Sequence, residues 1–226
     1  MSVIDNAWGY CDNDKYKVRC NGASVWVFDS EGNQLARFKD VPYAYRAKFK
    51  PGTNIIAVKS TAGYLAFYDL DKLELLKKFR TGINYSQDDG FDFSSDGKYL
   101  FNIERYKDDL NTRLAVYDAD SLELIDVPLD SELAGGLNNL ECTEGEIYLL
   151  YSGYKKSYIC QLAEREKVNS VRIPERLADK LSDYLDWRDS GFSPKQHDWD
   201  KENEAFYIGK KGPFTLKEVY EEYRTK

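Results

Sequence analysis

The sequence has few of the residues from which common catalytic sites are built. It contains one histidine and one methionine among 226 residues. The histidine, His197, would have to serve any Ser-His-Asp or Cys-His arrangement, yet it lies in a polar stretch, and the chain has no GxSxG nucleophile turn. We therefore expect His197 to be a solvent-exposed residue and the chain not to be an enzyme.

Cysteine is also scarce, and its spacing does not suit a metal. Cys11, Cys20, Cys142 and Cys160 form no CxxC pair and have no paired histidines beside them, so we expect no zinc site and no other metal site. Free thiols, buried or half-buried, are the expectation; two disulfides are the alternative if the chain is secreted. Neither a Walker sequence nor GxGxxG occurs, so no cofactor is indicated.

Basic residues are fewer than acidic ones, and long apolar runs are missing. Lys and Arg number 32 against 39 Asp and Glu, a net charge of −7. This balance works against binding to nucleic acids and anionic membranes, which need clustered cations, and it suits a basic protein partner. No apolar stretch approaches a membrane span, and Met1–Asp5 lacks the start of a signal peptide. We expect a cytoplasmic protein; solubility alone is the alternative reason for the charge.

What the sequence does contain is a repeat, seen most clearly in residues 90–127. Short apolar runs at residues 91–93, 99–103, 114–118 and 122–125 read as four strands in series. Asp96-Gly97 separates the first two, and Asp-Gly between alternating apolar runs predicts a hairpin because glycine adopts positive φ without a Cβ clash.

An aromatic-Asp pair ends the third strand of three of the copies. The pairs are Phe28-Asp29, Tyr68-Asp69 and Tyr117-Asp118, and an apolar residue follows each Asp by six positions. A fourth copy keeps this step from Leu162 but has lost the Asp. The first hairpin also keeps its length: the matching pairs are Phe49 and Ile56, Phe93 and Leu100, and Leu140 and Ile147.

Four antiparallel strands at a period of about 40 to 45 residues predict the blade of a β-propeller. The fold class is therefore all-β, with blades at residues 8–38, 45–79, 89–127 and 137–173. The sequence resembles the WD-repeat and related bacterial propeller families in Phe93-Ser94-Ser95-Asp96-Gly97, in Phe192-Ser193-Pro194, and in aromatic-Asp pairs where those families have Trp-Asp. The Gly-His pair of the better WD repeats is absent.

Residues 175–226 are less regular, and we interpret them as the closing segment of a single domain that spans residues 1–226. Residues 176–184 suggest a short helix or turn, and residues 187–192 and 204–209 could be two strands of a partial fifth blade. Thr215 and Glu218 form a capping box, and apolar residues follow at helical spacing. The sequence thus predicts a C-terminal helix and leaves open whether a fifth blade exists.

Acidic pairs occur at the turns after the third strands. Asp69-x-Asp71 and Asp118-x-Asp120 could ligate a cation or cap a turn. The turn is favoured because the glycine and distal glutamate of a calcium loop are absent.

One loop face is the candidate binding surface. The interval from Asp69 to Asp118 is nine residues longer than that from Asp29 to Asp69, and all nine extra residues fall in loops that join a second strand to a third or one blade to the next. Such loops emerge on one face of a propeller and here carry aromatics beside cations, which is typical of protein interfaces. The candidate residues are Tyr43, Tyr85, Tyr106, Tyr154, Arg105 and Lys155. The alternative is that 18 tyrosines place some in loops by chance.

These patterns favour a non-catalytic, protein-binding propeller, either an inhibitor of the immunity type or an adaptor. The expected partner is another protein, with a basic one favoured by the charge. The alternative function is a small enzyme acting on carbohydrate or peptide, with carboxylates around the central opening of the propeller. The sequence does not indicate the oligomeric state.

Overall fold

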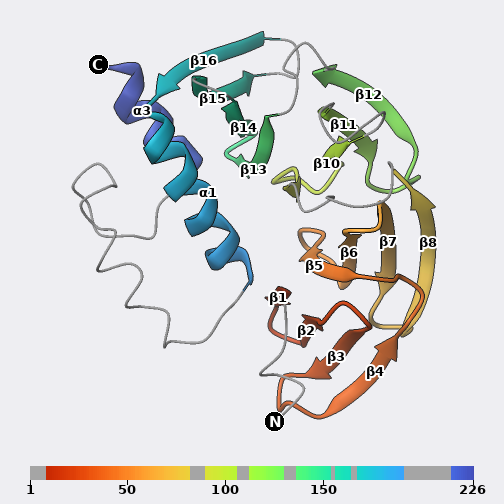
Figure 1. The fold of residues 1–226 in the computed structure, drawn as a ribbon. Coiled ribbons are helices and arrows are strands. Elements are labelled where there is room, and N and C mark those ends of the chain that lie inside the picture. The colour runs from red at the N-terminus through yellow and green to blue at the C-terminus, as the bar shows by residue number, and fades with distance from the viewer. Residues whose placement is uncertain are drawn as a thin grey trace.

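Four four-stranded antiparallel sheets follow one another around an arc in the computed structural model (Figure 1). The structure describes residues 9–81, 90–105, 112–129, 136–153, 156–163, 167–190 and 215–226. In every sheet the strands pair in chain order, so each sheet is a four-stranded meander. The arrangement is that of a β-propeller, and the predicted fold class is confirmed.

The blade boundaries agree with the sequence pattern to within about two residues. Blade one holds β1 (Gly9–Asp12), β2 (Tyr16–Cys20), β3 (Val25–Asp29) and β4 (Gln34–Phe38). Blade two holds β5 (Ala44–Phe49), β6 (Ile55–Ser60), β7 (Tyr64–Asp69) and β8 (Glu74–Arg80). Blade three holds β9 (Phe91–Phe93), β10 (Tyr99–Arg105), β11 (Thr112–Asp118) and β12 (Leu124–Leu129). Blade four holds β13 (Leu137–Thr143), β14 (Glu146–Gly153), β15 (Lys156–Ala163) and β16 (Lys167–Ile173).

The core consists of layers between successive blades. Side chains alternate along each strand, so the two central strands of a blade bury one set of residues against the preceding blade and the other against the next. Val18 and Val27 of blade one pack with Ile56 of blade two, and Phe101 of blade three packs with Ile147 of blade four. Blades two and three therefore depend on neighbouring blades for the burial of both faces.

Two helices cover the face of blade four that has no following blade. α1 (Glu175–Ser190) and α3 (Leu216–Arg224) pack on Tyr148, Leu150 and Ile159. α1 contacts β13, β14 and β15 and also reaches β1, so it spans the gap between the last blade and the first (Figure 1). Among the described residues, no helix is long and apolar enough to cross a bilayer.

α1 corrects part of the sequence interpretation of residues 175–226. The predicted short helix or turn is a helix of 16 residues. Residues 187–190 of the candidate strand 187–192 form its last turn, and residues 191–192 lie outside the described residues. The helix persists because Leu177, Leu181, Tyr184 and Leu185 form one buried stripe at helical spacing. Residues 204–209, the second candidate strand, lie outside the described residues.

The C-terminal helix and its capping box are confirmed. The Thr215 hydroxyl oxygen accepts a hydrogen bond from Glu218 N at 3.1 Å, and the Glu218 carboxylate accepts one from Thr215 N at 3.0 Å. Leu216, Val219 and Tyr220 form the buried side of α3.

Blade four departs from the predicted repeat in two places. Ile147 pairs with Cys142 and not with Leu140, because Glu144 and Gly145 form a two-residue turn in which both residues have positive φ. Leu162 pairs with Ile147 as Tyr117 pairs with Leu100. Leu162 therefore occupies the place of the aromatic residue, and the place of the lost Asp falls one position later.

Candidate functional site

The loop face lies at one end of the strands. It holds the turns that join the second strand of each blade to the third and the connections from one blade to the next. Tyr43 stands there in the connection from blade one to blade two, with a φ of 53° and 59% of its surface exposed. Its carbonyl oxygen accepts a hydrogen bond from Thr61 N at 3.1 Å, and the Pro42 carbonyl accepts one from the Ser60 hydroxyl. The backbone of this turn is thus anchored to the β6–β7 turn while the tyrosine ring faces solvent.

Arg105 is the other described member of the predicted loop-face set. It is the last residue of β10 and pairs with Thr112, so it lies at the same end of the strands as Tyr43. Tyr85, Tyr106, Tyr154 and Lys155 lie outside the described residues. The structure therefore places two of the six candidates on one face and leaves the other four as predictions.

A buried polar cluster lies directly beneath this end of blade three. The Glu104 side chain has no exposed surface, and its carboxylate accepts hydrogen bonds from the Tyr117 hydroxyl at 2.5 Å and from Asn102 Nδ2 at 3.1 Å. Arg113 binds the same carboxylate through Nε at 2.9 Å and through Nη2 at 2.8 Å. Burial, together with the nearby Glu104 carboxylate, raises the pKa of Tyr117 well above its usual range.

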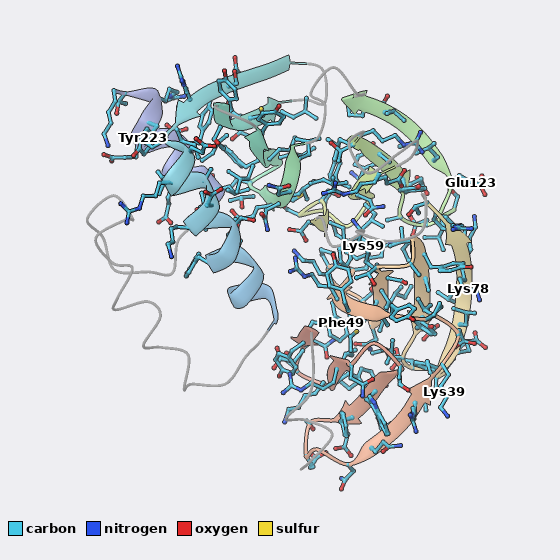
Figure 2. The ribbon with its side chains drawn as sticks, in the orientation of Figure 1. Lys39, Phe49, Lys59, Lys78, Glu123 and Tyr223 are labelled. Atoms are coloured by element: carbon cyan, nitrogen blue, oxygen red, sulfur yellow. The ribbon has the colours of Figure 1, made fainter. Side chains whose placement is uncertain are left out.

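Lys59 adds a cation to the same layer between blades two and three. Its ammonium donates to the Ile103 carbonyl oxygen at 2.6 Å and is almost fully buried. Figure 2 shows Lys59 in the interior, whereas Lys39, Lys78 and Glu123 lie along the outer rim. A buried, hydrogen-bonded polar layer of this kind fixes the relative positions of two blades.

The first strands of the blades, here called the inner strands, carry polar residues at matching positions in blades two, three and four. Lys48, Asp92 and Glu141 pair across to Ala57, Phe101 and Tyr148. Lys48 contacts Asp92 of the next blade at 3.3 Å, and Asp92 accepts a hydrogen bond from the backbone N–H of Cys142 in the blade after that.

Glu141 repeats the arrangement at the last blade with a different partner. Its carboxylate accepts a hydrogen bond from Leu216 N, at the start of α3. The helix end supplies the donor that a fifth blade would otherwise provide. In β1 the Asp12 carboxylate accepts from the Tyr10 hydroxyl, so each of these inner-strand carboxylates has a structural contact.

The opposite end of the strands is the hairpin face. It holds the turns that join the first strand of each blade to the second and the third strand to the fourth. Here the first Asp of each acidic pair caps its own turn: Asp118 Oδ1 accepts from Asp120 N at 3.0 Å and from Ser121 N at 2.7 Å. Asp69 does the same with Asp71 N and Lys72 N. The turn interpretation of these residues is confirmed.

The second Asp of each pair receives a lysine from the preceding blade. Lys15 of blade one binds Asp71, which also accepts from Asn54 Nδ2 at 2.9 Å. Lys50 of blade two binds Asp120 at 2.5 Å and the neighbouring carbonyl of Ala119 at 3.1 Å. The Lys15 ammonium, followed by the Asn54 amide, lowers the pKa of Asp71 to about 2.

The junction between blades three and four has no lysine at the position that corresponds to Lys50. Ser94 occupies the position in blade three that Lys50 occupies in blade two. The backbone N–H of Ser94 donates across its hairpin to Tyr99 O at 2.9 Å, and the backbone N–H of Lys50 donates in the same way to Ile55 O at 2.9 Å. The short side chain of Ser94 instead bonds within its own turn, to Asp96 and from Tyr99 N. The two-residue turn of blade four is also shorter than the loops of blades two and three.

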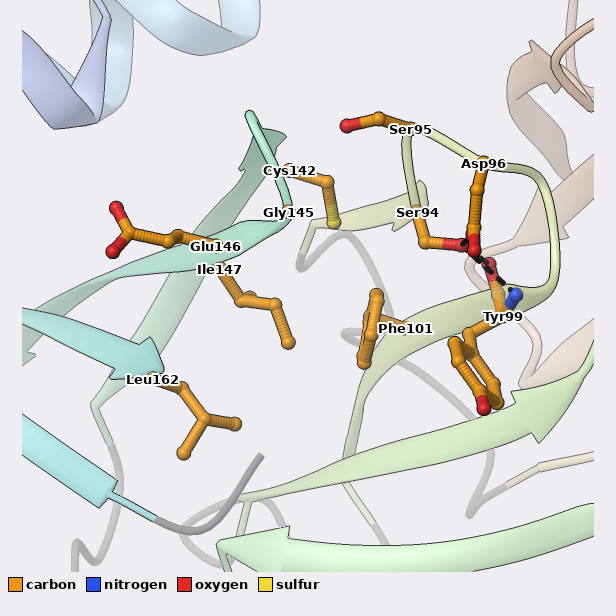
Figure 3. A pocket seen from close by; sticks show the side chains of 10 residues that line it. All are labelled: Ser94, Ser95, Asp96, Tyr99, Phe101, Cys142, Gly145, Glu146, Ile147 and Leu162. Atoms are coloured by element: carbon orange, nitrogen blue, oxygen red, sulfur yellow. Dashed lines mark hydrogen bonds between the residues drawn. The ribbon is translucent and has the colours of Figure 1, made fainter. Parts of the chain in front are cut away.

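A pocket of about 380 Å³ opens at this junction. The side chains of Phe101, Ile147 and Leu162 point into it, and Ser94, Ser95 and Asp96 stand along one edge (Figure 3). Tyr99, Cys142, Gly145 and Glu146 complete the lining. Sequence reasoning missed this pocket, although the change from Lys50 to Ser94 at matching hairpin positions was the available signal.

Two residues of the lining, Asp96 and Glu146, carry carboxylates, and that of Glu146 points away from the pocket (Figure 3). Hydrogen bonding by Ser94 and then by Lys98 lowers the pKa of Asp96 to about 2. The Tyr148 hydroxyl, at 2.5 Å, and Gln161 lower the pKa of Glu146. Burial raises the pKa of the Cys142 thiol, so this residue is a protonated wall of the pocket and not an activated nucleophile.

The four cysteines all fall in described strands and are free thiols, Cys20 and Cys160 buried and Cys11 and Cys142 half-buried, as the sequence predicted. Within the described ranges, no three His, Cys, Asp or Glu side chains gather closely enough to hold a metal ion. His197 lies outside those ranges.

No protein-family model matches the sequence, and no curated protein sequence does. Solved structures match in fold. Hydrazine synthase of Kuenenia stuttgartiensis matches with a TM-score of 0.58 and 15% identity over 71% of this chain and 51% of that one. Dihydro-heme d1 dehydrogenase NirN, in complex with DHE, matches with a TM-score of 0.56 and 17% identity over 71% of this chain and 35% of its own. The chain thus spans about half and about a third of these proteins, and the likeness shows the β-propeller fold alone.

Proposed function

We propose that this chain is a non-catalytic propeller that binds another protein through its loop face. The observation that carries the proposal is Tyr43, a large aromatic residue in the left-handed region of φ with more than half of its surface exposed. A bulky residue at positive φ costs roughly 1–2 kcal/mol relative to glycine. Such strain is concentrated at functional sites, and tyrosine is enriched in protein interfaces.

The enzyme alternative receives less support from the inner strands. Asp12, Asp92 and Glu141 hold a tyrosine hydroxyl, a lysine with a backbone N–H, and the start of a helix. Carboxylates that are used in this way suit a structural role better than a glycosidase pair facing an open centre.

The proposal includes kinship with the WD-repeat-like bacterial propellers and a cytoplasmic location. Tyr68-Asp69 and Tyr117-Asp118 support the first, because each aromatic is buried and each Asp caps a turn as the repeat requires. The four free thiols support the second. The net charge of −7 supports a basic partner, which an immunity-type inhibitor or an adaptor could hold.

The test compares Tyr43→Gly with Leu73→Gly. Leu73 has a φ of 54° and is 38% exposed, but it lies in the β7–β8 turn on the hairpin face, so it matches Tyr43 in strain and not in place. Relief of strain, less the backbone entropy of glycine, should leave either variant within about 1 kcal/mol of the parent or slightly more stable.

The tagged parent and both variants are used to capture proteins from a native cell lysate, with quantitative mass spectrometry. We expect Tyr43→Gly to lose the partner that the parent and Leu73→Gly retain. Equal capture by both variants would overturn the assignment of the loop face. Inhibition of an activity of the purified partner would then separate an inhibitor from an adaptor.

A further inference from the structure

We propose that the pocket between blades three and four binds a small, uncharged apolar molecule, about the size of one or two aromatic rings. The pocket lies on the hairpin face, beside the turns that join the first and second strands of these two blades. Tyr43 stands at the other end of the strands, where a first strand begins. The pocket is therefore separate from the loop face, and the inference does not rest on the proposed function.

Blade four lacks two aromatic side chains that blades two and three place against the preceding blade. The two rings are Phe49 and Tyr68, which flank Ile56 in blade two, and Phe93 and Tyr117, which flank Leu100 in blade three. All four pack in the layers between blades. In blade four the matching residue, Ile147, is flanked at the same register by Cys142 and Leu162, and both of these line the pocket.

Blade three makes up only part of this difference. Phe101 adds one ring to the layer, at the register position where blades one and two have Val18 and Ala57. The Lys50 stem, which lies at the junction of blades two and three, has no counterpart here because Ser94 stands at its position. The remaining space is about 380 Å³, whereas an apolar cavity of about 150 Å³ is enough to hold benzene.

The interior of the pocket is apolar. The side chains of Phe101, Ile147 and Leu162 point into it and are almost fully buried in the layer between the blades (Figure 3). Burial raises the pKa of the Cys142 thiol, so this part of the wall is uncharged. An apolar molecule that enters gains the free energy of leaving water, as a buried side chain does.

The two carboxylates of the lining do not offer a partner to a charged occupant. The Glu146 carboxylate points away from the pocket and accepts a hydrogen bond from the Tyr148 hydroxyl at 2.5 Å (Figure 3). Asp96 stands at the edge and is already paired with Lys98 at 2.9 Å. A charged molecule would therefore lose its hydration inside the pocket without gaining an ion pair, and an uncharged one is favoured.

Toluene and N-methylpyridinium test the inference, because they share size and shape and differ in the charge on the ring. Isotope-labelled protein is titrated with each compound, and backbone amide signals are followed by NMR. We expect saturable shifts at Ser95, Gly145 and Ile147 with toluene, and binding of N-methylpyridinium that is weaker by about tenfold or more. No saturable toluene shift at these residues, or equal affinity for the two compounds, would overturn the proposal.

Two variants restore the aromatic residues of the other blades. Leu162→Tyr places a tyrosine at the position of Tyr117, and Cys142→Phe places a phenylalanine at the position of Phe93, so each should abolish toluene binding. Leu35→Tyr is the matched control, at a residue that is 41% exposed on the fourth strand of blade one, and it should bind toluene as the parent does.

Cys142→Phe is the decisive variant, because Cys142 is half-buried whereas Leu162 is packed on all sides. Circular dichroism checks that each variant is folded. A folded Cys142→Phe protein that keeps the toluene affinity of the parent would refute the assignment of the pocket as the binding site.

Discussion

Replacing Glu104 with glutamine should destabilise the protein more than any surface charge substitution. The carboxylate is fully buried and is bound by Arg113, Tyr117 and Asn102. Glutamine keeps the shape but removes the charge and turns an amide N–H₂ toward these donors. Loss of one partner of a buried ion pair costs about 3–5 kcal/mol. Arg113 is 24% exposed and can be hydrated in part, so we expect the low end, about 3 kcal/mol.

At roughly 2–4 °C for each kcal/mol in a protein of this size, Glu104→Gln should lower Tm by about 6–12 °C. The assay is urea unfolding followed by circular dichroism, with calorimetry for Tm. Glu74→Gln is the matched control, since its side chain is 52% exposed and a surface change should stay within about 0.5 kcal/mol. Tyr117→Phe should cost about 1.5 kcal/mol, and the double variant should cost less than the sum. A Glu104→Gln protein as stable as the Glu74→Gln control would refute this account of the buried layer.

Two further predictions concern the blade junctions. Asp71 has a pKa lowered to about 2 in the folded protein, so its pairing with Lys15 contributes stability that is present above pH 4 and is lost as the pH falls toward 2. The Asp71→Asn variant should therefore be less stable than the parent at pH 7, but its free energy of unfolding should fall less between pH 4 and pH 2. Urea midpoints at each pH measure this, and parallel pH curves for the two proteins would contradict it. Glu141→Gln should destabilise the start of α3 by about 1–2 kcal/mol and speed amide hydrogen exchange at residues 218–220. The control is Glu144→Gln, which changes an exposed carboxylate paired with Lys217 and should leave exchange at these residues unchanged. Equal exchange rates in the two variants would contradict the role of Glu141.

The architecture was largely predictable because the repeat is written in local signals. The aromatic-Asp pairs and the turn glycines depend on φ and on short-range hydrogen bonds, so spacing alone located the four blades. The misalignments at Leu140 and Leu162 arose because a two-residue turn replaces a longer loop in blade four, and apolar residues on both faces of a buried sheet hide a shift in register.

The closing segment was harder to predict from sequence. Trp187 and its neighbours resemble a strand when taken alone, since aromatic residues favour sheets. The helix that includes these positions packs on Tyr148 and Leu150 of blade four through Leu181 and Leu185, and this contact between distant parts of the chain has no local signature.

For the candidate site, composition located the loop face but not the pocket. Tyr43 could be predicted as a binding residue because it lies in a connection between blades, but its positive φ could not be predicted from the sequence. The pocket exists because neither of the two neighbouring hairpins fills the junction: the Ser94 side chain is short, and the Glu144-Gly145 turn has only two residues. A comparison of matching lysine positions between blades would have indicated the junction, but not its volume.

Closure by α1 bears on how many blades this architecture can have. When the last strand of a ring pairs with the first, backbone hydrogen bonds fix both the register and the number of blades. Here α1 packs on blade four and lies beside β1, and no strand of the described residues pairs across this seam, so no register is imposed there. Sixteen helical residues extend about 24 Å. The blade count of such a ring is therefore set by the span that a helix can bridge, and insertion or loss of a blade requires a change in helix length but no new strand pairing at the seam.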